Sequence, residues 1–422
     1  FHLHCHSAGN SQSSCTGGWS TITSSGKTAK NNILVAAVTS TDAMTSFSSF
    51  GPAADGRVKP EIAAFGNSVF STSTPLNTYA TLSGTSMATP GVAGTVTLLV
   101  QRYKQLNADN LPISSLIKNI VLNGANDLGN AGPDYKFGYG RINALQAVRF
   151  LEQNRYVVST ITTGNSNTQT INVPAGAARL KVMLTWNDPA GTANANPALV
   201  NNLDLVVTNG ANNTLPWVLD PNNPGNVATR GVDNVSNIEQ VTINNPDAGD
   251  YQLRVTGTAI PSGPQEYSLT WSVDQPYIEV IYPNGGESFN PGTTEIITWD
   301  NVGVTGNQTV EYSLNNGTSW TTISSTVAAA TTRLSWTVPA GNTSTALIRV
   351  SSGAITDVSD ANFNILGTTT GFTTGASGCG SGSVSFTWNA VTNATNYDIY
   401  KLDPASGYFE ILSANITGTS HT

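Results

Sequence analysis

The residues best suited to chemistry surround one serine, Ser86, in the segment LSGTSMATPGVAG over residues 82–94. Small residues flank this serine and a helical apolar run follows, so we expect Ser86 at a tight turn that begins a helix. At such a turn a hydroxyl can attack a carbonyl carbon, and a free backbone N–H can stabilise the anion that forms. Gly84 permits close backbone approach, and we expect Pro90 near the first turn, where its missing amide hydrogen costs little. The nucleophile elbow of α/β-hydrolases is excluded because Ala88 replaces its second glycine.

The elements that must position Ser86 alternate between strands and helices over residues 1–152. Residues 33–38 are continuously apolar, which predicts a strand buried on both faces of a parallel sheet. A long buried helix is expected from Ser86 to about Tyr103, and a second over residues 114–122 with Ser114 as its N-cap. A third, amphipathic helix should pass through Leu145, Val148, Phe150 and Leu151. This alternation predicts a parallel α/β sheet.

Five stretches, in order, resemble the subtilisin-like serine proteases (subtilases). They are SAGN at 7–10, KTAKN at 27–31, FSSFGP with DGRVKPE over 47–61, the serine segment, and GYGRIN at 138–143. The resemblance implies a three-layer α/β domain in which Ser86 attacks a peptide carbonyl. It also implies that the Asn10 side-chain amide and the Ser86 N–H hold the oxyanion. Ser7, Ala8 and Gly9 would line the pocket for the residue before the scissile bond, a lining that is small and neutral in this sequence.

The catalytic base and the carboxylate that orients it cannot be assigned. In subtilases both precede the segment that contains Asn10, and this sequence starts nine residues before Asn10. We therefore expect the aspartate and histidine upstream, and we expect this fragment alone to be inactive. His2, His4 and His6 share one strand face, a spacing that could bind zinc, but we favour an ordinary strand end.

From about residue 154 apolar residues alternate, which predicts all-β sandwich modules and a multidomain chain. Residues 156–274 resemble the jelly-roll β-sandwich that follows the catalytic domain in one bacterial subtilase branch. Residues 276–366 resemble an immunoglobulin-like module, and residues 383–422 resemble a truncated fibronectin type III module. Residues 367–382 are rich in Gly, Ser and Thr and predict a flexible linker.

Composition limits the partners. Charged residues make up only 10% of the chain and the net charge is −8 without a basic cluster, so we expect no nucleic-acid binding. No apolar run approaches the roughly 20 residues of a membrane span.

We expect a secreted serine endopeptidase, extracellular or at the cell surface, with protein or peptide substrates. The alternative is a cell-surface adhesive or carbohydrate-binding protein that carries an inactive protease-like domain and contacts polysaccharide through exposed aromatic residues of its β modules.

Acidic residues and asparagines cluster in predicted turns of the second domain. Asp188, Asp204, Asp220 and Asp233 provide oxygen ligands of the kind calcium prefers, and equally fit ordinary Asx turns. Related jelly-roll domains often bind calcium, and we predict Asp188 and Asp204 as ligands of a structural calcium ion. Cys5 and Cys15 could form a disulfide, which would leave Cys379 unpaired.

Overall fold

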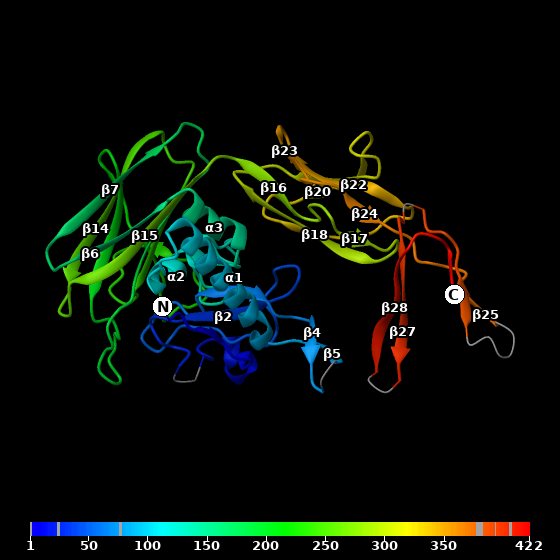
Figure 1. Ribbon diagram of the computed structural model, residues 1–422. Coiled ribbons are helices and arrows are strands. Elements are labelled where there is room, and N and C mark those ends of the chain that lie inside the picture. The colour runs from blue at the N-terminus through cyan, green and yellow to red at the C-terminus, as the bar shows by residue number, and fades with distance from the viewer. Residues whose placement is uncertain (1, 23–25, 76–77, 377–382, 393, 405–406) are drawn as a thin grey trace. The chain divides into compact units, whose positions relative to one another are not determined.

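The computed structural model describes residues 2–422 except 23–25, 76–77, 377–382, 393 and 405–406 (Figure 1). It divides into two compact units, 1–275 and 276–422, which we treat separately. In the described residues all helices end before residue 153, which confirms the predicted change of pattern near residue 154. None of the helices in this described part is long and apolar enough to cross a membrane.

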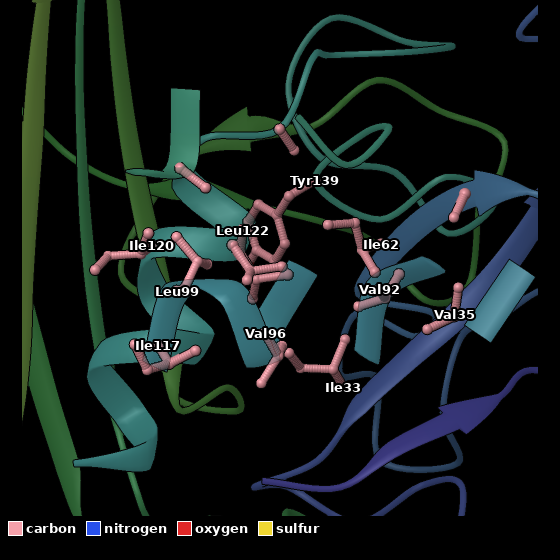
Figure 2. Packing of buried hydrophobic residues seen from close by; sticks show 14 of the residues in the cluster. Ile33, Val35, Ile62, Val92, Val96, Leu99, Ile117, Ile120, Leu122 and Tyr139 are labelled. Carbon is pink, nitrogen blue, oxygen red and sulfur yellow. The ribbon is translucent and has the colours of Figure 1, made fainter. Parts of the chain in front are cut away.

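A short parallel sheet carries the serine segment. Its order is β1 (Cys5–Ser7), β2 (Ile33–Val38) and β3 (Ile62–Phe65), and every residue of β2 is fully buried, as predicted. Helix α1 (Thr85–Leu106) packs Val92, Val96 and Leu99 against this sheet and its neighbouring helices (Figure 2). Burial of each such side chain contributes about 1.5–3 kcal/mol, so this layer fixes where the helix begins.

Two expectations about α1 need correction. The helix is buried on one face only: Leu98 is 62% exposed, and no atom lies within 4 Å of a Cβ built at Gly91 or Gly94. Pro90 lies in the second turn, inside the helix and not at its start. The helix continues through Pro90 because its buried face holds it against the sheet.

Helix α2 (Ser114–Asn123) is buried nearly all round, because it lies between the first core and the following β-sandwich (Figure 1). Ser114 is its first residue and not its N-cap, and the Ser114 hydroxyl accepts a hydrogen bond from Asn187. Asn119 donates to the backbone carbonyls of Met183 and Ser268 at 2.9 Å each. Helix α3 (Ala144–Glu152) has the expected extent, and its N-cap Asn143 accepts from the Gln146 N–H.

The sandwich of unit 1 consists of two antiparallel sheets, in the orders β10-β9-β14-β7 and β13-β8-β15-β6. Its strands are β6 (Tyr156–Ile161), β7 (Ser166–Val173), β8 (Arg179–Trp186), β9 (Asn202–Asn209), β10 (Asn212–Thr214), β13 (Ile238–Asn244), β14 (Gly249–Ala259) and β15 (Gln265–Asp274). Two smaller hairpins complete unit 1: β4 (Val69–Ser73) with β5 (Thr78–Leu82), and β11 (Trp217–Val218) with β12 (Thr229–Arg230). The alternating residues predicted as core, from Leu180 to Trp186 and from Leu203 to Val207, are buried between the sheets.

Unit 2 is entirely β in its described residues. Its larger part holds β16 (Tyr277–Tyr282), β17 (Ser288–Phe289), β18 (Thr294–Val302), β19 (Gln308–Ser313), β20 (Thr321–Val327), β21 (Arg333–Thr337), β22 (Thr343–Ser352), β23 (Ile355–Val358) and β24 (Phe363–Ile365). Its last strands are β25 (Thr373–Ala376), β26 (Val384–Thr387), β27 (Tyr397–Asp403), β28 (Tyr408–Ile416) and β29 (Ser420–His421). Since β25 pairs with β26, the predicted linker over 367–382 contains a strand, and only part of it is irregular.

Candidate active site

Ser86 is the second residue of α1, and its side chain is exposed at the N-terminal end of that helix. The residue before it, Thr85, is 1% exposed and anchors the turn. The N–H groups of Met87 and Ala88 both bond back to the Gly84 carbonyl. Within the described residues, neither the N–H nor the hydroxyl of Ser86 makes a hydrogen bond. An exposed hydroxyl therefore lies beside an unused donor, where the helix dipole favours negative charge.

Asn10 reaches the same helix end from the loop after β1. Its Oδ1 accepts two hydrogen bonds from Thr85, one from the N–H at 3.0 Å and one from the hydroxyl at 2.9 Å. The Thr85 hydroxyl in turn accepts from the Gly9 N–H at 3.1 Å. Because its oxygen is held in this way, the amide presents its Nδ2 hydrogens away from Thr85.

The two unused donors both lie close to Gly84. A Cβ built at Gly84 would lie 3.2 Å from Asn10 Nδ2 and 3.8 Å from Ser86 N. Because Gly84 carries no side chain, the approach to both donors is less crowded than it would be beside any other residue. Such a pair of donors beside a nucleophilic hydroxyl is the arrangement that acyl transfer requires for its tetrahedral intermediate.

Comparison with known proteins identifies the family of the first domain. Residues 2–140 match the model of the subtilase family, a span that includes both Asn10 and Ser86. The first domain of this chain is a subtilase domain. Residues 165–257 match the bacterial pre-peptidase C-terminal domain, so the sandwich is the β-rich domain that follows it.

The curated relatives carry protease names. The C5a peptidase of Streptococcus pyogenes is 42% identical over 87 residues, which are 20% of this chain and 7% of that protein. The serine protease/ABC transporter B family protein tagA of Dictyostelium discoideum is 25% identical over 263 residues, covering 53% of this chain and 15% of that protein. This chain thus spans less than a sixth of the length of either relative.

Among solved structures, the prenylagaramide maturation protease PagA is similar to 35% of this chain and 50% of its own, at 24% identity and a TM-score of 0.29. Tripeptidyl peptidase 2 covers 73% of this chain and 35% of its own, at 14% identity and a TM-score of 0.26. At these TM-scores the structural likeness adds nothing to the family assignment.

Ser7, Ala8 and Gly9, which are predicted to line a substrate pocket, lead from β1 to Asn10. Ser7 ends β1, Ala8 is fully buried, and Gly9 has a φ of +108°, a conformation that favours glycine. The segment itself is small and neutral, but the side chain of Lys27 comes against it. The Lys27 ammonium lies 3.5 Å from the Ala8 carbonyl oxygen. Although Lys27 opens the stretch KTAKN, no local pattern marks a lysine 17 positions after Asn10 as a neighbour of this segment.

The histidines lie elsewhere. The rings of His4 and His6 stack at 6.0 Å, and with His2 they line a groove of about 680 Å³ between the subtilase domain and the sandwich. Across the described chain, no histidine is hydrogen-bonded to Ser86. In the same part of the chain, no three His, Cys, Asp or Glu side chains form a group that could hold a metal, so the zinc alternative has no support.

A second polar cluster lies deep inside the subtilase domain. Glu61 Oε1 accepts from the ammonium groups of Lys59 and Lys118, and its Oε2 accepts from the Leu34 N–H at 2.8 Å. The side chains of these three ionisable residues are only 1–2% exposed. Burial lowers the pKa of Lys59 to about 7 and also lowers that of Lys118, partly offset by the Glu61 carboxylate. Because every member is satisfied by protein groups, this cluster is structural.

Both carboxylate oxygens of Asp188 accept from protein donors. It pairs with Lys30, and it accepts from the N–H groups of Val200 at 2.9 Å and Asn201 at 2.7 Å. This contact joins the subtilase domain to the sandwich, so the geometry does not support a metal-binding role for Asp188.

Cys5 and Cys15 are free thiols, which corrects the possible disulfide, and Cys379 lies outside the described residues.

Asp204 lies in a different setting, on β9 beside Glu239 of β13. Glu239 is 1% exposed; its Oε2 accepts from the Leu205 N–H at 2.6 Å. Three buried oxygens here have no hydrogen-bond partner: Asn202 Oδ1, Asp204 Oδ1 and Glu239 Oε1. Burial raises the pKa of Glu239 well above its ordinary value, and the carboxylates of Asp233 and Asp204 raise it further. No local signal in the sequence marks Glu239, because it occupies an ordinary alternating strand position.

Proposed function

We propose that this chain is part of a secreted serine endopeptidase that hydrolyses peptide bonds through an acyl-enzyme on Ser86. One observation carries the proposal: Asn10 Nδ2 and Ser86 N, both unused as donors in the described residues, lie close to Gly84 at the helix end that bears the exposed Ser86 hydroxyl. Neutral donors aimed at one point stabilise the charge that develops on a carbonyl oxygen when a hydroxyl attacks it.

In the proposed reaction a histidine, oriented by an aspartate, removes the Ser86 proton as Oγ attacks the scissile carbonyl carbon. The oxyanion is held by Asn10 and the Ser86 N–H. The tetrahedral intermediate then expels the amine, which takes the proton from the histidine, and water hydrolyses the ester. We propose that the histidine and aspartate come from sequence outside these 422 residues, since the histidines described here do not bond Ser86.

The test is labelling of the whole protein with a fluorophosphonate, which reacts with an activated serine. We expect the label on Ser86, no label in Ser86→Ala, and no turnover from residues 1–422 alone. A whole protein that carries both partner residues, folds normally and still neither labels nor cleaves peptides would contradict the proposal.

We propose that the β modules act as spacers in an extracellular enzyme. Three of their tryptophans, Trp186, Trp299 and Trp336, are at most 3% exposed and belong to the cores. Strands β27 and β28 expose the rings of Tyr400 and Phe409, which is the kind of feature that polysaccharide binding would use. We therefore propose protein or peptide substrates on the strength of the Ser86 site and not of the modules.

We also propose that the sandwich holds a structural calcium ion, with Asp204 retained from the sequence prediction and Asp188 replaced. Asn202, Asp204 and Glu239 supply the three unpartnered buried oxygens described above, and oxygen donors with two carboxylates suit calcium. A bound cation would offset the repulsion between carboxylates that cannot be solvated.

Calcium should raise the melting temperature of the sandwich by mass action, and chelation should lower it. Glu239→Gln and Asp204→Asn should each remove the rise. Asp220→Asn is the matched control, because Asp220 is exposed and only accepts from its local turn. A melting temperature that changes with neither calcium nor chelator would contradict the proposed calcium site.

A further inference from the structure

The stretch FSSFGP over residues 47–52 contains two serines, Ser48 and Ser49, that the proposed reaction does not use. Both are fully buried, and in both the hydroxyl oxygen accepts a hydrogen bond from a backbone N–H at 3.1 Å. Ser48 accepts from Ala37 in β2, the middle strand of the parallel sheet, whereas Ser49 accepts from Ser11. Because Ser11 directly follows Asn10, only the second serine holds the segment that carries the proposed oxyanion donor.

Ser49 holds the backbone on both sides of Asn10. The Ser49 N–H donates to the Gly9 carbonyl at 2.8 Å, and the Ser49 Oγ accepts from the Ser11 N–H at 3.1 Å. The backbone N–H and C=O of Asn10 itself make no hydrogen bond among the described residues. The position of the Asn10 backbone therefore depends on how its two neighbours are held.

Packing at Gly9 adds to this contact. A Cβ built at Gly9 would lie 3.1 Å from Ser49 Oγ and 3.8 Å from Ser49 Cβ, so the serine side chain occupies the space beside the glycine. A further hydrogen bond, from the Gln12 N–H to the Phe47 carbonyl at 3.2 Å, continues the contact between the two segments. Of the three hydrogen bonds, only the one to Ser49 Oγ uses a side chain, so it can be removed without changing the backbone.

The amide of Asn10 and its backbone are fixed by different residues. Thr85 holds the amide oxygen at the start of α1, and Ser49 holds the chain on either side of the Asn10 Cα. A shift of that Cα would move Nδ2 relative to Ser86 even if the bonds to Thr85 remained. A donor stabilises an oxyanion only within a narrow range of distance and direction, so both supports are needed.

We infer that Ser49 is a positioning residue, which holds Asn10 where its amide can donate to the oxyanion. The inference rests on the proposed serine endopeptidase function. Because the oxyanion develops only as the hydroxyl attacks, a misplaced donor should slow the chemical step and leave substrate binding nearly unchanged. The effect of Ser49 should therefore appear in kcat and not in KM.

The experiment measures steady-state kinetics of Ser49→Ala in the whole protein, with kcat expressed per Ser86 that a fluorophosphonate labels, so that misfolded molecules are not counted. We expect kcat to fall about five- to tenfold, the effect of one lost hydrogen bond, with little change in KM. Ser48→Ala is the matched control, because it removes the same kind of bond from an equally buried serine, and it should keep the wild-type kcat. In an Asn10→Ala background, Ser49→Ala should cause little further loss, since it acts through Asn10.

Three results would overturn the inference: an unchanged kcat in Ser49→Ala, an equal fall in Ser48→Ala, or a full further loss in the Asn10→Ala background. In each of these cases Ser86 would still label and Asn10→Ala alone would still lower kcat. Absence of both labelling and cleavage would instead contradict the proposed function, so the two failures are distinguishable.

Discussion

Two polar clusters of the subtilase domain differ in how their hydrogen-bonding groups are used. Around Glu61 each carboxylate oxygen has protein partners, and both lysines are buried. Around Ser86 the supporting atoms are equally constrained, but the hydroxyl, the Ser86 N–H and Asn10 Nδ2 are left without partners in the described residues.

This difference separates a structural network from a site prepared for a ligand. A buried charge that is fully paired contributes to one folded state, and removing a partner is costly. Hydrogen-bond donors that are held in place but have no protein acceptor contribute little to the free energy of folding. They remain available to a substrate. Changes in the first cluster should therefore alter stability, and changes in the second should alter turnover.

The largest effect on stability should come from Glu61→Gln. It leaves Lys59 and Lys118 buried without a counter-charge, and we expect the free energy of unfolding of unit 1 to fall by about 3–5 kcal/mol. Chemical denaturation measures this fall. Glu152→Gln is the control, because the pair between Glu152 and Arg102 is exposed and should change stability by less than about 1 kcal/mol. A small loss for Glu61→Gln would show that the cluster is not a closed network.

Asn10→Ala should act on turnover. In subtilisin, loss of the equivalent asparagine lowers kcat about 100- to 1000-fold, and we expect a similar loss with a much smaller change in KM. Steady-state kinetics on the whole protein separates the two. A rise in KM at constant kcat would mean that Asn10 binds the ground state and is not an oxyanion donor.

Gly84→Ala tests the space between the two donors. The backbone at Gly84 has a φ of 161°, which any residue adopts, so the variant should fold normally. Its methyl group would lie 3.2 Å from Asn10 Nδ2, where it would crowd the proposed oxyanion donor. We expect kcat to fall by at least about tenfold with the melting temperature nearly unchanged. Wild-type turnover would place the oxyanion elsewhere.

Thr85→Val should have a smaller effect. Valine preserves the shape of the side chain but removes the hydroxyl between Gly9 and Asn10, so the amide is held by one hydrogen bond instead of two. We expect about a tenfold fall in kcat. Thr85→Ser should restore most of the lost turnover, and failure of this rescue would argue against an orienting role for the hydroxyl.

The last effect concerns pH. Because burial lowers the pKa of Lys59 to about 7, the unfolded chain holds a proton between pH 7 and 10.5 that the folded chain lacks. Stability should therefore rise with pH in that window, by at most about 1.4 kcal/mol per pH unit, and below pH 7 this group adds no slope. Denaturation at pH 7, 8 and 9 measures the slope. An identical slope in Lys59→Met would assign it to other groups.

Much of the fold followed from local pattern. The continuous apolar run at 33–38 and the alternating strands from Leu180 to Val207 have the predicted type and burial. The helix after Ser86 has the predicted type but is buried on one face only. The errors fall where distant contacts decide. Ser114 is not the N-cap of α2, because its hydroxyl accepts a hydrogen bond from Asn187, the residue that directly follows β8. Part of the predicted linker is a strand because β26 offers it an edge.

The sequence by itself determined which residues are chemically able to act. A serine between small residues at a helix start, and an asparagine after a short glycine-containing segment, carry their chemistry in residue type and spacing. A local motif of this kind can be predicted from the sequence, because the turn and the nucleophile lie within a few residues of each other.

The tertiary structure alone decided which oxygens and charges face one another. In the structure Asp188 forms an ion pair with Lys30, and the Lys27 ammonium lies close to Gly9. One oxygen each of Asp204 and Glu239 has no hydrogen-bond partner among the described residues. Each of these pairs joins different elements of the chain, and the packing of strands and helices sets their distances. Pairing and desolvation depend on those distances, so a carboxylate that looks like a ligand in sequence becomes an ion-pair partner in the fold.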